Sequence, residues 1–187
     1  MGEIRLQWWR ETVEGARTGN PRVHDVARAL AELFARTDLP NALFDAVIDA
    51  RAFDLSRERA PDQQALDDYI DATSGNLMRL AARVLDANAT HDDLSREAGI
   101  AYGLAGLTRS EAFHRARGKH FIHDTGLVAA EAKRRFASAQ TLPKPGRSLP
   151  AFLPAALVPL YLKHPERERP IFRKQLAFLS AHLRGRL

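Results

Sequence analysis

The sequence predicts an all-α protein on two observations. Apolar residues recur at intervals of three and four along most of the chain, which is the period of an amphipathic helix. No segment alternates apolar and polar residues as a half-buried strand does, and no internal repeat is evident. The chain has 187 residues and no cysteine. We therefore expect one domain over residues 1–187, and we exclude disulfide scaffolds and thiolate zinc sites.

Three helices are expected in the first third of the chain. The second begins after Pro21, the sequence Asp38-Leu39-Pro40 ends it, and the third ends near Leu55. Each has an apolar face at helical spacing, marked by Leu6, Trp9 and Val13, by Val26, Leu30 and Leu33, and by Leu43, Val47 and Ile48. Of the adjacent tryptophans Trp8 and Trp9, we expect one in the core and one half-exposed, and the same pattern equally fits a partner surface.

A longer helical segment is expected after Pro61, a residue suited to the first turn of a helix. Gly75 lies in the middle of this segment, where glycine costs about 1 kcal/mol relative to alanine. We therefore expect a close helix contact or a kink at Gly75, beside a ligand. One face of the segment is apolar and comprises Leu66, Tyr69, Ile70, Thr73, Leu77, Leu80, Ala81 and Val84.

The remaining chain predicts further helices separated by proline and glycine. One is expected from a cap at Thr90 or Asp92 to about Arg117, and its three glycines indicate tight packing or the wall of a cavity: Gly99, Gly103 and Gly106. A sixth helix is expected over residues 126–138, a loop over 140–148, and two shorter helices after it. The last helix has an apolar stripe, which usually belongs to a core and otherwise forms an interaction surface: Phe172, Leu176, Leu179 and Leu183.

Charge is distributed unevenly along the chain. Residues 1–108 hold 12 Lys/Arg and 18 Asp/Glu, a net of −6, whereas residues 109–187 hold 16 and 5, a net of +11. A basic half attracts polyanions such as lipid headgroups or diphosphate esters, although solvated helix faces give the same pattern. The N-terminus lacks a signal-peptide core and no apolar stretch is long enough to span a bilayer, so a cytoplasmic protein is expected.

Two clusters of potential metal ligands stand out. The sequence Asp67-Asp68-Tyr69-Ile70-Asp71 places Asp67 and Asp71 on one helix face, where such a pair can hold Mg²⁺ ions that bridge a diphosphate. That chemistry needs a second, facing cluster, and the pair Asp45 and Asp49 indicates only a solvated face, so surface charge is the simpler interpretation. A second group could ligate a transition metal, but its spacing matches no tight pattern: His114, His120, His123 and Asp124.

Several segments together resemble the squalene/phytoene synthase family, the trans-isoprenyl head-to-head synthases. Residues 4–11, IRLQWWRE, resemble the family's Leu-x-x-Trp-Trp-Arg-Glu helix, and residues 24–55 follow its next stretch. Residues 69–77, YIDATSGNL, are similar to the family's Tyr-Cys-x-x-Val-Ala-Gly-x-Val-Gly segment. Residues 101–123 align without a gap to its second aspartate-rich helix. The resemblance covers nearly the whole chain and implies a helical bundle of the isoprenoid synthase type.

The second aspartate-rich motif of that family, Arg-Asp-x-x-x-Asp, is degenerate in this sequence. Arg109 is retained, but Ser110 and His114 stand where the family has its aspartates. The sequence begins at the Trp-Arg helix, so we expect a bundle that lacks the family's first helices and first aspartate-rich motif. Serine and histidine cannot replace carboxylates as hard ligands for the metal that ionises a diphosphate. No cofactor is therefore expected, and Mg²⁺ at Asp67 and Asp71 only if the chain is active.

Because its second motif is degenerate, the chain resembles the catalytically degenerate members of the family. These include the phytoene-synthase-like assembly factors of respiratory complex I. This resemblance implies a non-catalytic accessory or assembly protein, with a prenyl-lipid or phospholipid binder and an active prenyltransferase as alternatives. The pocket candidates of a binder are Tyr69, Thr73, Gly75, Leu77, Leu104 and Thr108. The candidates for contact with its phosphate are Arg109, Arg115, Arg117 and Lys119. We expect a protein partner or self-association, no nucleic acid, and at most peripheral contact with the inner membrane.

Overall fold

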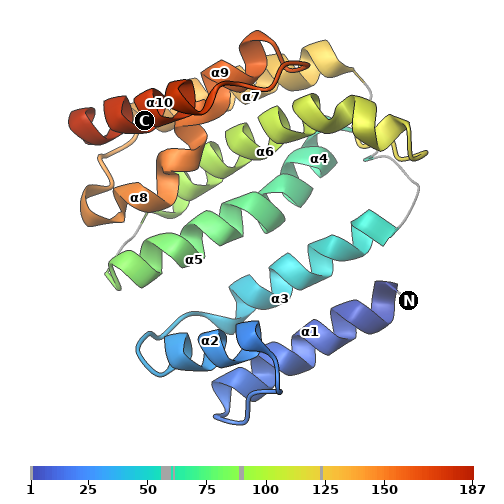
Figure 1. Ribbon diagram of the computed structural model, residues 1–187, viewed down its shortest axis with the longest axis vertical. Coiled ribbons are helices and arrows are strands. Elements are labelled where there is room, and N and C mark those ends of the chain that lie inside the picture. Colours follow the sequence, from blue (N-terminus) through green and yellow to red (C-terminus); the bar gives the residue numbers. More distant parts are fainter. Residues whose placement is uncertain (1, 56–59, 61, 89–90, 123) are drawn as a thin grey trace. The chain divides into compact units, whose positions relative to one another are not determined.

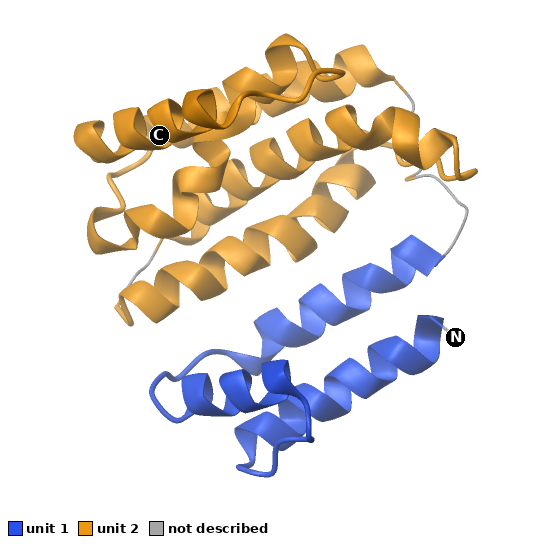
Figure 2. Cartoon of the chain, viewed as in Figure 1, with its two compact units in different colours: residues 1–56 blue, residues 57–187 orange. Residues whose placement is uncertain are grey.

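The structure, a computed structural model, describes residues 2–55, 60, 62–88, 91–122 and 124–187 (Figure 1). Within these residues the regular elements are all helical and no strand is present, which confirms the all-α prediction. No helix of the described part is both long and apolar enough to cross a membrane. The chain separates into two compact units, unit 1 with residues 1–56 and unit 2 with residues 57–187 (Figure 2). The single domain expected over residues 1–187 stays a prediction.

Unit 1 is built around its first helix. Its elements are α1 (Gly2–Arg17), α2 (Asp25–Phe34), α3 (Asn41–Ala50) and the 3₁₀ helix η1 (Arg51–Leu55). Helix α1 contacts each of the other three. His24 caps α2, because its Nδ1 accepts a hydrogen bond from the backbone N–H of Val26 at 3.2 Å. The predicted break at residues 38–40 and the predicted end near Leu55 are both confirmed.

The two tryptophans of α1 form an aromatic cluster with His24. The ring centroids of Trp8 and Trp9 are 4.8 Å apart, and that of His24 is 5.3 Å from Trp8 and 5.8 Å from Trp9. Both tryptophans are half-buried. The prediction that one of them belongs to the core is therefore wrong, because the rings pack against each other and His24.

Unit 2 is organised around the long helix α6. The helices before it are α4 (Gln63–Ile70), the π-helical turn η2 (Asp71–Gly75) and α5 (Asn76–Leu85). Those from α6 onward are α6 (Asp92–Arg115), α7 (Thr125–Thr141), η3 (Gly146–Ser148), α8 (Leu149–Phe152), η4 (Leu153–Leu157), α9 (Val158–Lys163) and α10 (Ile171–Arg184). Helix α6 packs against α4, α5, α7, α8 and α9 (Figure 1). Its inward side chains Ile100 and Leu104 are fully buried.

Several predicted boundaries need correction. Helix α7 continues to Thr141 and η3 follows at Gly146–Ser148, so the predicted loop over residues 140–148 is shorter than expected. Asp92 is the first residue of α6 rather than its cap, and Thr90 lies outside the described residues. The helix ends at Arg115, two residues before the predicted end.

The long helix predicted after Pro61 is interrupted by the π-helical turn η2. Such a turn inserts one extra residue, which rotates the following side chains by about 100° around the helix axis. The predicted apolar face holds before the turn, where Leu66 and Ile70 are buried, and changes in part after it. Leu80 is buried as predicted, whereas Val84 is 40% exposed, so its assignment to this face is wrong. Met78 and Ala82 are buried where an uninterrupted helix has Leu77 and Ala81. Leu77 is 51% exposed, so its assignment to the apolar face is wrong.

Glycines bring η2 into direct contact with α6. A Cβ atom on Gly99 would lie 2.5 Å from Cα of Gly75, and one on Gly103 would lie 2.4 Å from Cγ2 of Ile70. The close helix contact predicted at Gly75 and the tight packing predicted at Gly99 and Gly103 are thus confirmed. Gly106 has open space beside it, so tight packing is wrong there, and the alternative of a cavity wall stays a prediction.

Candidate functional site

The carboxylate of Asp67 is enclosed by unit 2. It lies within α4 and is only 2% exposed. Nη2 of Arg135 donates a hydrogen bond to its Oδ2 at 2.6 Å, and Nε2 of Gln63 donates to its Oδ1 at 2.6 Å. Each oxygen therefore has a donor, and the negative charge has a cation beside it, as burial of a carboxylate requires.

Arg135 of α7 holds three carboxylates at once. Besides Asp67, its Nη1 donates to Glu97 of α6 at 2.7 Å and its Nε to Glu131 of α7 at 2.7 Å. Arg134 donates from Nε to Glu131 at 2.7 Å. The planar guanidinium suits this role, because its donors form a fixed fork. We call the set of Gln63, Asp67, Glu97, Glu131, Arg134 and Arg135 the Arg135 network.

Asp71 has a different set of partners, although it lies only four residues after Asp67. It belongs to η2 and accepts hydrogen bonds from Arg79 at 2.8 Å and from Arg96 at 3.4 Å. Asp68, the third aspartate of the motif, is exposed and accepts from Gln64 at 2.8 Å. The three carboxylates therefore do not form one cluster.

The pKa shifts follow from these contacts. Burial raises the pKa of Asp67 above its ordinary value of 3.8, and hydrogen bonds from Gln63 and Arg135 oppose that rise. Hydrogen bonding by Arg134 lowers the pKa of Glu131 from 4.5 to about 2, with Arg135 acting in the same direction. Burial lowers the pKa of Arg135, but hydrogen bonds to its three carboxylates outweigh burial and raise it. Arg135 therefore stays charged over the whole ordinary pH range.

The degenerate motif positions are satisfied within the protein. Oγ of Ser110 donates to the carbonyl of Gly106 at 2.9 Å, within the same helix. The ring of His114 packs edge-on against Phe121, with the centroids 4.8 Å apart. Neither side chain supplies a carboxylate oxygen, and each has a contact within unit 2.

The six pocket candidates are mostly part of the packing of unit 2. Thr73 and Thr108 are buried, and their hydroxyls donate to the carbonyls of Tyr69 and Leu104, each at 2.9 Å. Leu104 and Gly75 are buried in helix contacts, Tyr69 stacks on Phe121, and Leu77 faces outward. A pocket of about 310 Å³ between α7 and α9 is lined by other residues: Lys133, Phe136, Val158, Pro159, Leu162 and Lys163. A ligand role for the six candidates stays a prediction.

The four phosphate-contact candidates divide into two places. Arg109 faces α9, where its guanidinium lies 4.1 Å from the ring centroid of Tyr161 and donates to Glu168 at 3.2 Å. The other three lie at or just after the C-terminal end of α6: Arg115, Arg117 and Lys119. Arg115 pairs with Glu111 at 2.8 Å. Their contact with a phosphate stays a prediction.

Metal coordination finds no other support among the described residues. They contain no group of three or more His, Asp or Glu side chains that could hold an ion. His123 lies outside the described part of the chain. In unit 1, Asp49 pairs with Arg10 and is 61% exposed, which agrees with a solvated face.

Residues 1–127, about two thirds of the chain, match the family model described as squalene/phytoene synthase. The chain belongs to the squalene/phytoene synthase family. Curated relatives include NADH dehydrogenase (ubiquinone) complex I, assembly factor 6, from mouse, 28% identical over 123 residues. The human protein of that name is 27% identical over 123 residues. The match covers 65% of this chain but only 37% of each relative. No solved structure matches the chain.

The described carboxylates do not fit the divalent metal that the synthase chemistry of this family implies. Mg²⁺ prefers several oxygen ligands in a near-ideal octahedron, usually carboxylates and waters. The oxygens of Asp67 accept from Arg135 and Gln63, and those of Asp71 accept from Arg79 and Arg96. A metal ion at either carboxylate would compete with a guanidinium already bound there.

Sequence reasoning missed the arginine partners of this family member's DDxxD segment. Glu131 and Arg135 are four residues apart on a predicted helix, a spacing that indicates a local ion pair. The bond from Arg135 to Asp67 joins residues 68 apart. Only the packing of α7 beside α4 and α6 reveals it.

Proposed function

We propose that this member of the squalene/phytoene synthase family is non-catalytic and acts, through a protein partner, in the assembly of an NADH dehydrogenase of the complex I type. The observation that carries the proposal is the neutralisation of Asp67 and Asp71 by arginines of the same unit. With Asp67 and Asp71 paired to arginines, and with Ser110 and His114 at the family's aspartate positions, the described residues offer no group of three or more ligands for the metal that ionises a diphosphate.

The similarity to complex I assembly factor 6 supports the assembly role, because that name describes relatives matched over 65% of this chain. We further propose a cytoplasmic location, peripheral to the inner membrane. The NADH dehydrogenase subunits of that membrane are the partners to test first.

Catalysis is tested with the purified protein and farnesyl or geranylgeranyl diphosphate, with and without Mg²⁺. We expect no release of diphosphate above the protein-free blank, while an active phytoene synthase assayed in parallel releases it. Asp68→Asn is the matched variant, because Asp68 is exposed and its loss disturbs little packing. Release that requires Mg²⁺ and disappears in Asp68→Asn would overturn the non-catalytic assignment.

The assembly role is tested by deleting the gene in its own host. We expect less fully assembled NADH dehydrogenase on native gels and a matching loss of NADH:quinone reductase activity in membranes. Both the unmodified gene and Asp68→Asn should restore them. A full amount of assembled enzyme in the deletion strain would contradict the proposal.

A further inference from the structure

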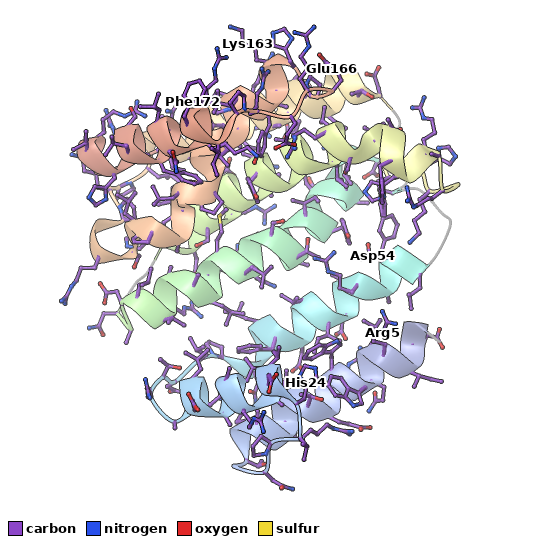
Figure 3. All side chains as sticks on the ribbon, in the orientation of Figure 1. Arg5, His24, Asp54, Lys163, Glu166 and Phe172 are labelled. Carbon is purple, nitrogen blue, oxygen red and sulfur yellow. The ribbon has the colours of Figure 1, made fainter. Side chains whose placement is uncertain are left out.

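Helix α10 carries an exposed apolar stripe. Four large side chains spaced along one side of the helix are between 52% and 77% exposed: Phe172, Leu176, Leu179 and Leu183 (Phe172 is labelled in Figure 3). The interpretation of this stripe as part of a core is therefore wrong. Ala181, on the opposite side of the helix, is fully buried, and Ala177 and Phe178 pack against the cluster around Val158. The helix is attached through this second, smaller face, which leaves the leucines outside.

The stripe is long and continuous. Phe172 and Leu183 are eleven residues apart, which corresponds to about 16 Å along a helix. Single exposed leucines are normal on protein surfaces, whereas a continuous apolar patch marks a surface that binds something.

The charged residues of α10 itself are all positive. Helix α10, all of which the structure describes, contains no Asp or Glu, and it carries Arg173, Lys174 and Arg184. On a helical projection, Arg173 and Arg184 lie within about 80° of Leu176, so they border the stripe. The acidic residues just before the helix are partly engaged, since Glu168 accepts from Lys174 and Arg109.

An apolar stripe bordered by arginines fits the surface of an anionic bilayer. Leucine and phenylalanine side chains enter the boundary of the acyl chains, while guanidinium groups reach the lipid phosphates. A second copy fits less well, because pairing two α10 helices would bring Arg173 and Arg184 toward other cations without an acidic residue to balance them.

We propose that α10 is a membrane-docking helix, which lies in the interface of an anionic phospholipid bilayer through Phe172, Leu176, Leu179 and Leu183. This inference supplies a surface for the peripheral location and does not depend on the role in NADH dehydrogenase assembly. The two proposals can therefore fail separately.

The direct test is sedimentation of the full chain with vesicles. Phosphatidylcholine vesicles that contain about one third phosphatidylglycerol present the anionic surface, and pure phosphatidylcholine vesicles are the control. We expect binding to the anionic vesicles that weakens as salt is added, and much weaker binding to the neutral ones. Equal binding to both, or to neither, would overturn the proposal.

Two matched leucine variants locate the contact. Leu183 on α10 is 77% exposed and Leu127 on α7 is 68% exposed, so glutamate at either position makes the same change of charge on a similar surface. We expect Leu183→Glu to bind anionic vesicles at least about tenfold more weakly than the unmodified chain, because one leucine no longer enters the bilayer. Leu127→Glu should lose much less, and equal losses would contradict a role for α10.

A neutral variant separates the loss of apolar contact from the added negative charge. Light scattering tests whether a second copy of the chain covers the stripe instead. Leu176→Ser with Leu183→Ser should also release the protein from vesicles, with an unchanged circular dichroism spectrum as evidence of folding. If light scattering shows a dimer that Leu183→Glu dissociates, while the unmodified chain ignores vesicles, a second copy occupies the stripe and the proposal is wrong.

Discussion

The Arg135 network and the stripe on α10 reverse the usual distribution of side chains: the network buries charged groups, and the stripe exposes apolar ones. In the network, an aspartate that is 2% exposed meets an arginine that is 11% exposed. On α10, leucines and a phenylalanine lie mostly in solvent. The network supplies its own countercharges, since its three carboxylates all bond to Arg135. The side chains of the stripe, in contrast, are not covered by apolar residues of the described part of the chain, and they face outward.

This difference shows how to weigh a cluster of reactive residues. Carboxylates buried against guanidinium partners are costly to unpair and offer no free ligand to a metal ion. Apolar side chains held outside contribute little to folding and remain available for binding. In this protein Asp67 and Asp71 of the conspicuous acidic motif are paired with arginines, and the less conspicuous last helix is the better candidate for an interaction.

The largest effect is expected from removing the shared cation of the network. Arg135→Ala leaves Asp67, Glu97 and Glu131 close together without the cation that they share, which should lower the free energy of unfolding by about 3–5 kcal/mol. Urea unfolding followed by far-UV circular dichroism measures this, since both tryptophans belong to unit 1 and do not report on α7.

The neighbouring arginine is the control for that substitution. Arg134 also pairs with Glu131, but its side chain is 62% exposed, so Arg134→Ala should cost less than about 1 kcal/mol. Similar losses for the two variants would show that the network does not act as a buried unit.

The second largest change in the free energy of unfolding is expected at the contact between η2 and α6. Gly99→Ala places a Cβ atom 2.5 Å from the Cα of Gly75, a backbone atom that cannot turn aside, and should cost about 1–3 kcal/mol. Gly106→Ala, on the same helix with open space beside it, should instead stabilise by up to about 1 kcal/mol. The same unfolding experiment compares them, and a loss in both variants would contradict the difference in packing.

The third prediction concerns acid. The pKa of Glu131 is lowered in the folded protein to about 2 from 4.5, so the folded state favours the ionised form. The resulting stability is present above pH 4.5 and is lost as the pH falls toward 2. The rise in the pKa of Asp67 acts in the opposite sense, because that carboxyl binds its proton more readily when folded.

Glu131→Gln isolates the contribution of Glu131. In the variant, the free energy of unfolding should fall less steeply between pH 4.5 and 2 than in the unmodified protein. Urea titrations at a series of pH values measure both slopes. Equal slopes would mean that Glu131 does not carry the acid sensitivity.

The smallest effect on the free energy of unfolding is expected from a substitution in the stripe on α10. Leu183→Ser removes a side chain that is 77% exposed and should change the free energy of unfolding by less than about 0.5 kcal/mol. Leu104→Ala, at a fully buried position of α6, should cost about 2–5 kcal/mol. A large loss for Leu183→Ser would show that the stripe belongs to a core after all.

Much of the fold could be predicted from the sequence, because helices leave a strong local signal. The period of the apolar residues, and breakers such as Pro40, locate most helices to within a few residues. The family was evident from short segments such as IRLQWWRE, and the match over residues 1–127 confirms it.

The candidate site was harder to predict, because its decisive contacts are not local. The bond between Asp67 and Arg135 depends on how α4 and α7 pack. The spacing of apolar residues in the sequence showed the stripe on α10, but it did not show that the stripe is exposed. The helix packs inward through a smaller face at Ala177 and Ala181 instead. A period identifies a face, and only packing shows which of two faces is buried.

The π-helical turn at Asp71–Gly75 has a consequence for how this segment can change by mutation. Residues 76–85 contain two apolar rows, offset by one position: Met78 and Ala82, which are buried, and Leu77 and Ala81, which an uninterrupted helix would bury. Deleting a single codon within the turn would rotate the residues after it by about 100° and bring Leu77 and Ala81 toward the inner side. An insertion or deletion of one residue can therefore change part of the inner lining of α5 without any substitution within it.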